Sequence, residues 1–84
     1  QMIHYIVAIV VFMQPQMQTI SVMQLPYPNV DECKKAIVQD GRTLQNDIMV
    51  MYPKADRFSL VCIDKKTVKD IVDQMKLSVT GKEI

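Results

Sequence analysis

The sequence predicts a small α+β domain: a sheet of two or three strands, with a long helix and a shorter C-terminal helix on one face, in the order β-β-α-β-α. The length of 84 residues allows one domain. Hydrophobic residues make up 49% of the chain, which excludes a disordered protein. Short β-branched runs alternate with segments of helical periodicity, which indicates the element order.

Charged residues are unevenly distributed along the chain. The ten basic and nine acidic residues all lie between Asp31 and Glu83, and the net charge is only +1. We therefore expect no nucleic acid partner, because such partners require a strong basic excess. An uncharged first third is typical of a membrane, targeting or association segment. We expect an apolar leader, anchor or association strand at residues 1–16, one domain at 17–77 and a frayed tail at 78–84.

Residues 2–13 form an apolar run that is open to two interpretations. Twelve residues are too few for a membrane-spanning helix, but they match the hydrophobic part of a signal peptide. No Lys or Arg precedes the run, and no small-residue cleavage site follows it. The β-branched residues equally favour a strand, joined through residues 14–16 to a second strand at 17–25.

Both faces of such a strand are apolar, so it needs a cover: the sheet of its own chain, a neighbouring subunit or a membrane surface. We expect the segment either to be lost on export or to be buried against a partner. The expected association surface is formed by Ile3, Ile6, Val7, Ile9, Val10, Val11 and Phe12.

The middle of the chain has the pattern of a long helix. Asn29 can cap it, and acidic residues follow in the first turn. One helical face repeats at Val30, Cys33, Ile37, Leu44, Ile48 and Met51. This phase predicts one helix from residue 30 to about 52, ended by Pro53; two helices broken at Asp40 and Gly41 are the alternative.

Residues 57–63 form a short apolar run that is rich in strand-favouring residues, and this run predicts the last strand. Asp64 then caps a helix that runs to about Leu77. The apolar stripe of this helix is Val68, Ile71, Val72 and Met75.

The two cysteines fall on inward positions of two predicted elements. Cys33 lies on the inner stripe of the long helix, and Cys62 shares a strand face with Phe58 and Leu60. If the helix packs on that face, the two sulfurs meet, and we predict a disulfide; two buried thiols are the alternative. The bridge would indicate an oxidising compartment.

Residues with catalytic potential are sparse. His4 is the only histidine and has no acidic residue within 26 positions, so we expect neither a catalytic site nor a cofactor. Thioethers bind Cu(I), which makes Met13, Met17 and Met23 candidate copper ligands. Methionine is also an ordinary core residue, so no metal site is the simpler expectation.

The stretch from Thr19 to Cys33, Thr-Ile-Ser-Val-Met-Gln-Leu-Pro-Tyr-Pro-x-x-x-Glu-Cys, together with Phe-Ser-Leu-Val-Cys-Ile at 58–63, resembles small uncharacterised proteins of marine cyanophages. These have a leader-like start and two cysteines. The resemblance implies a disulfide and an extracytoplasmic setting: periplasmic, membrane-associated or in a virion. It implies no activity, and a cytoplasmic location stays open.

Two functional hypotheses follow. The first is a non-catalytic structural or interaction protein, stapled by a disulfide, that associates through its uncharged N-terminal third with a protein partner, with itself or with a membrane surface. The alternative is an exported module that binds a small ligand or copper through its methionines.

Overall fold

A computed structural model describes the backbone of residues 2–83 and the side chains of residues 2–74. The predicted element order β-β-α-β-α is confirmed. The elements are β1 (His4–Met13), β2 (Gln16–Tyr27), α1 (Val30–Met51), β3 (Arg57–Asp64) and α2 (Lys65–Glu83). The second helix thus continues past Leu77, where the sequence pattern ended it. The side chain of Met75, expected on its apolar stripe, lies outside the described residues.

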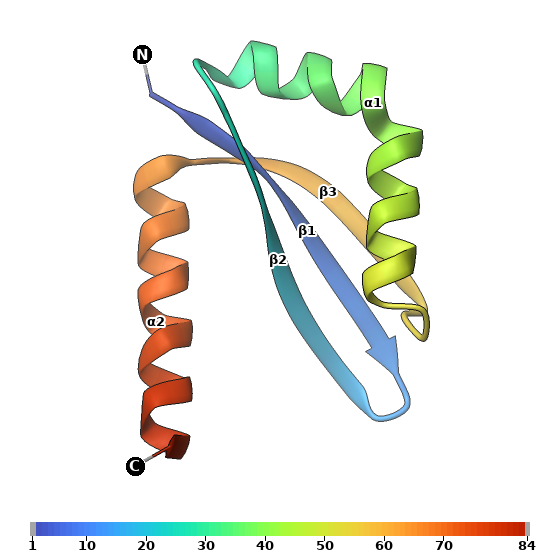
Figure 1. The fold of residues 1–84 in the computed structure, drawn as a ribbon, viewed down its shortest axis with the longest axis vertical. Coiled ribbons are helices and arrows are strands. Elements are labelled where there is room, and N and C mark those ends of the chain that lie inside the picture. Colours follow the sequence, from blue (N-terminus) through green and yellow to red (C-terminus); the bar gives the residue numbers. More distant parts are fainter. Residues whose placement is uncertain (1, 84) are drawn as a thin grey trace.

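The three strands form one antiparallel sheet in the order β2-β1-β3, with β1 in the middle (Figure 1). Gln14 and Pro15, joined by a cis peptide bond, connect β1 to β2. The β1–β2 register is regular from Met13 back to Val7 and shifts between Val7 and Tyr5. The first apolar run is therefore a strand, and the boundary expected at residue 16 lies inside a hairpin.

The long helix is continuous through Gly41, as its phase predicted. The side chain of Asn29 caps it by accepting a hydrogen bond from the Glu32 N–H at 2.9 Å. Within the predicted stripe, Cys33 and Ile48 are fully buried, and Val30, Ile37 and Leu44 are half-buried. The burial predicted for Met51 is wrong, because this residue at the helix end is 50% exposed, and Ala36 is buried instead.

The main core lies between α1 and one face of the sheet. One cluster joins Ile6 to Cys33 and Ala36, and the other joins Ala8 and Val10 to Ile48. From β3, the side chains that pack on these clusters are Phe58, Leu60 and Cys62, the face that sequence periodicity assigned to the helix.

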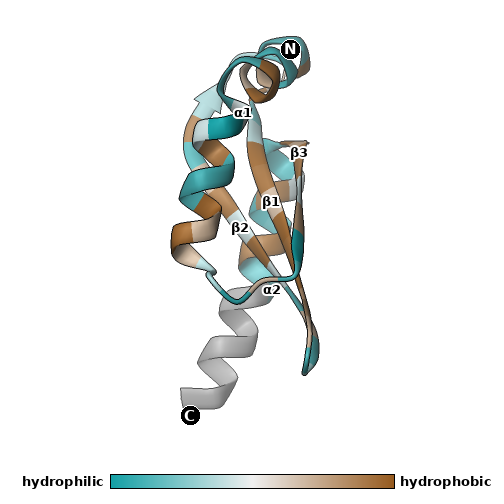
Figure 2. Ribbon diagram, turned by 90° about the vertical axis from the view of Figure 1, so that its right-hand side faces the viewer, coloured by the Kyte–Doolittle hydropathy of each residue, from teal (hydrophilic) through white to brown (hydrophobic). Residues whose placement is uncertain are grey.

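The expectation that both helices cover one face is wrong. Figures 1 and 2 show α2 on the side of the sheet opposite α1. Val7 points away from α1, since it alternates with Ile6 and Ala8 along β1, yet it is only 2% exposed. Val68 of α2 is also buried and belongs to neither α1 cluster. A central strand that is apolar on both faces requires cover on both.

Candidate association surface

The residues expected to form an association surface lie on the central strand of the sheet or directly before it. Ile6, Val7 and Val10 are at most 2% exposed, because β1 is the central strand and helices cover both of its faces (Figures 1 and 2). Ile9, Val11 and Phe12 are half-buried, and Ile3 is 38% exposed. The first strand therefore supplies the centre of the domain, and the expected surface is wrong for Ile6, Val7 and Val10.

The uncharged surface of the N-terminal third lies on β2 instead. Its position in the sheet leaves one long edge without a neighbouring strand among residues 2–83. Natural edge strands are commonly protected by charged residues, by proline or by being short. Between Gln16 and Leu25, β2 has no charged residue and no proline; Pro26 stands only at its end. The opposite edge strand, β3, is shorter and has Arg57 and Asp64 at its ends.

Hydrogen bonds at the two ends of β1 fix which backbone groups point toward β3. The N–H of Lys65 donates to the carbonyl of Ile3 (2.7 Å), and the N–H of Asp56 donates to that of Val11 (2.9 Å). The N–H of Met13 donates to the Asp56 carboxylate (2.6 Å). Ile3, which directly precedes β1, and Val11 and Met13 within it all have odd numbers. Because backbone groups of a strand alternate in direction, the even-numbered residues of β1 direct theirs toward β2.

The pairing register of β1 with β2 shows which β2 residues direct their backbone groups toward β1. Val10 lies opposite Thr19, and Ala8 lies opposite Ser21. The backbone groups of Thr19 and Ser21 therefore face β1. Those of Gln18, Ile20 and Val22, which alternate with them, face the open side of the sheet.

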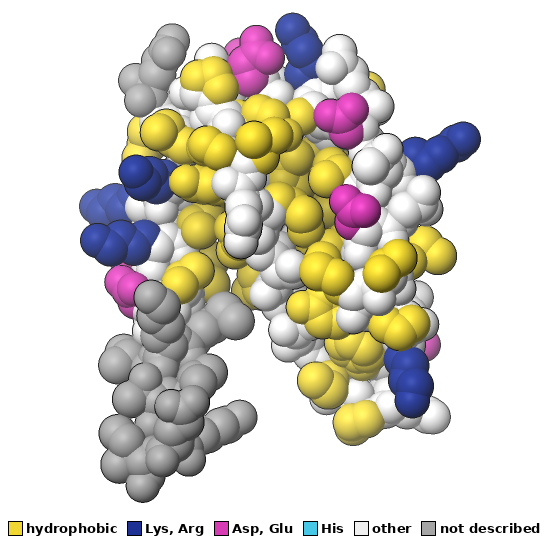
Figure 3. Space-filling view, viewed as in Figure 1, with side chains coloured by type: hydrophobic (Ala, Val, Ile, Leu, Met, Phe, Trp, Pro, Cys, Tyr) yellow, Lys and Arg dark blue, Asp and Glu magenta, His cyan; other side chains and the backbone are white. Residues whose placement is uncertain are grey.

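The side chains along this edge are apolar or uncharged. Met17 is 50% exposed and Leu25 is 64% exposed, and the residues between Thr19 and Met23 are half-buried. Figure 3 shows hydrophobic and uncharged polar side chains across the strands, between charged side chains over α1 and α2. We call the outward edge of β2 from Gln18 to Val22, with its side chains, the β2 edge.

The methionines proposed as copper ligands are not gathered at one point. Met13 (54% exposed) and Met17 lie at the hairpin end. Since Met17 pairs with Phe12, it points to the opposite face from Met13. Met23 packs against both α1 clusters. Within the described residues, no three His, Cys, Asp or Glu side chains form a group able to hold a metal ion.

The predicted disulfide is confirmed. Cys33 and Cys62 are bonded, with their Cα atoms 6.1 Å apart and a sequence separation of 29. Cys33 is fully buried in the first turn of α1. The bond indicates a non-reducing environment. Neither helix is both long and apolar enough to cross a bilayer, over the part of the chain that the structure describes.

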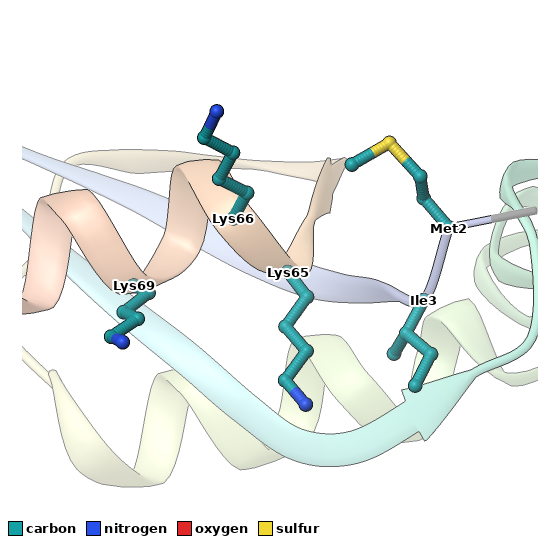
Figure 4. Close-up of a pocket in the computed structure, with 5 residues that line it drawn as sticks. All are labelled: Met2, Ile3, Lys65, Lys66 and Lys69. Atoms are coloured by element: carbon teal, nitrogen blue, oxygen red, sulfur yellow. The ribbon is translucent and has the colours of Figure 1, made fainter.

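A shallow hollow of about 420 Å³ lies where β1 and α2 begin, lined by Met2, Ile3, Lys65, Lys66 and Lys69. Figure 4 shows Lys65 and Lys66 extending to opposite sides of the helix. The three ammonium groups therefore do not converge on one position, as an anion site would require.

Sequence reasoning missed one pairing near this hollow: Asp64 lies opposite His4 across the β1–β3 ladder. Asp64 caps α2, as predicted, by accepting hydrogen bonds from the Thr67 hydroxyl (2.7 Å) and N–H (3.0 Å). These bonds hold the pKa of its carboxyl below the usual range, with the charge of His4 a smaller cause. Both Asp64 oxygens thus serve the helix cap, and the nearest partner of His4 Nδ1 is the Met2 carbonyl oxygen at 2.8 Å.

Comparisons of the chain with protein-family models, with curated proteins and with solved structures found no match.

Proposed function

We propose that this chain is a non-catalytic interaction module that binds an extended protein segment by strand addition at the β2 edge. The single observation behind the proposal is the set of outward backbone groups at Gln18, Ile20 and Val22, on a strand without charge. Main-chain hydrogen bonds supply affinity in this mode, and alternate side chains supply specificity.

The rest of the fold supports this role by holding the edge in place. The β2 strand is paired along β1, which α1 covers on one face. The disulfide joins α1 to β3, which is the strand at the opposite edge of the same sheet. An edge held in strand geometry before binding loses little conformational entropy when a partner adds to it.

A matched pair of variants at one exposed position tests the proposal. Gln18→Pro removes an outward N–H that β1 does not use, whereas Gln18→Thr keeps it. Proline is tolerated on edge strands, so both variants should stay folded by circular dichroism. The probe is a displayed library of random extended peptides, selected on the wild-type chain.

We expect selected peptides to bind wild type and Gln18→Thr alike and to bind Gln18→Pro about tenfold or more weakly, since an outward hydrogen bond is lost and the proline ring blocks close approach. Selected peptides that bind Gln18→Pro as tightly as wild type would contradict the proposal, because their site would then lie elsewhere.

A further inference from the structure

We infer that the extended segment bound at the β2 edge is the β2 edge of a second copy of this chain, in a two-fold symmetric dimer with one continuous sheet. The inference rests on the proposed function and names the partner for the same surface.

The backbone of this edge is complementary to itself. Antiparallel pairing about a two-fold axis places outward residues of one copy opposite outward residues of the other. Gln18, Ile20 and Val22 would face the same three residues of the second copy. Each open N–H then finds a carbonyl, and each copy keeps its pairing with β1 unchanged.

The charge pattern also favours a second copy. In a two-fold interface, a charged residue near the axis meets the same charge on its partner, which is unfavourable directly across strands. The β2 edge avoids this cost, since no residue between positions 1 and 30 is charged. A strand that recruited a charged partner would instead be expected to contain the complementary charge.

The central side chains of the two copies are compatible on each face. Thr19 and Ser21 share one face of β2, and pairs of such hydroxyl residues across strands are favourable. On the other face, Ile20 lies opposite Ile20 of the second copy, where β-branched side chains pack well, and Val22 lies opposite the uncharged Gln18. Met17, half exposed in the single chain, lies on the Thr19 face and would lose solvent contact.

The β3 edge is a poorer partner for β2. It is shorter, and its terminal residues Arg57 and Asp64 would lie beside an uncharged strand. Pairing β2 with β3 of another copy is also head-to-tail, so it leaves a free edge at each end and continues into an open assembly. Two-fold pairing of β2 with β2 uses the β2 edge of both copies, so the assembly stops at a dimer.

The test uses the full chain with its disulfide intact. Sedimentation velocity over a range of concentrations should show a dimer that dissociates to a monomer on dilution. Hydrogen exchange should show the N–H groups of Gln18, Ile20 and Val22 protected in the dimer and fast in the monomer. Gln18→Thr should dimerise like wild type, and Gln18→Pro should raise the dissociation constant about tenfold or more.

A second variant covers the case in which Gln18→Pro does not fold. Gln18→Lys keeps the backbone N–H and adds one positive charge to each copy; the two charges then lie on the same face of the joined sheet, about 14 Å apart along the strands. It should weaken the dimer at low salt, and added salt should restore part of the affinity.

The outcomes separate this inference from the proposed function. A monomer at every concentration with fast exchange at Gln18, Ile20 and Val22 overturns the dimer but leaves an open edge for another protein. A monomer in which these N–H groups are protected overturns both, because the edge is then covered within the chain. A dimer that Gln18→Pro and Gln18→Lys leave intact, or an open-ended assembly, overturns the two-fold β2 pairing.

Discussion

The disulfide between Cys33 and Cys62 joins the first turn of α1 to β3 across the main core, with the two Cα atoms 6.1 Å apart. Cys33 is fully buried beside Ile6 and Ala36. The bond therefore closes the crossover from β2 to β3 at the point where α1 begins. For so short a chain, which buries a small share of its surface, such a constraint is a large part of total stability.

Replacing both cysteines, as Cys33→Ala with Cys62→Ala, should lower the free energy of unfolding by about 3 to 4 kcal/mol. The estimate is the loop-closure entropy that a bridge across about 30 residues removes from the unfolded chain. Urea denaturation of the double variant and the oxidised wild type measures the difference. A loss below about 1 kcal/mol would show that the bridge adds little to a core that is already sufficient.

Gly41→Ala should stabilise the protein by about 0.5 to 1 kcal/mol. Gly41 lies inside α1 without a positive φ, and a Cβ placed there meets no atom within 4 Å. Alanine thus gains helix propensity without a steric cost. Thermal or urea unfolding measures the change. Destabilisation would mean that α1 bends or breaks at Gly41 in solution.

Asp64 should make stability depend on pH at the acidic end. Its pKa is lowered in the folded protein by the hydrogen bonds from Thr67, so protonation favours the unfolded chain. This contribution is fully present above the unfolded pKa of about 3.9 and is lost as the pH falls through the folded pKa.

Asp64→Asn is the control, because asparagine also caps helices but does not titrate. The difference in melting temperature between wild type and Asp64→Asn should shrink as the pH falls below about 4. An unchanged difference down to the acid limit of folding would remove Asp64 from the acid response.

Local features of the fold were predictable because the residues that determine them are close in sequence. Asn29 and Asp64 cap helices through groups three residues away. The phase from Cys33 to Ile48 spans Gly41 without a shift, which correctly predicted one helix. The disulfide followed from two such local patterns, one helical and one extended, on facing surfaces.

The position of each element in the sheet was not predictable in the same way. Periodicity shows that both faces of β1 are apolar, but not whether its own chain or a partner covers them. Ile6, Val7 and Val10 were therefore assigned to a surface, although they lie in the core. The open edge of β2 depends on strand order, and the placement of His4 opposite Asp64 depends on register. Strand order and register are both set by contacts between residues far apart in sequence, so local patterns do not reveal them.

Ile48 and Val50 offer a matched test of the core itself. Both are β-branched residues in the last turns of α1, so mutation to alanine changes helix propensity in the same favourable direction at each. They differ in burial: Ile48 is fully buried against Ala8 and Val10, and Val50 is 81% exposed.

Ile48→Ala should therefore cost about 2 to 5 kcal/mol of unfolding free energy, from lost burial and from the cavity left beneath α1. Val50→Ala should change it by no more than about 0.5 kcal/mol. Urea denaturation of the two variants measures both values, and equal losses would place the C-terminal half of α1 off the sheet.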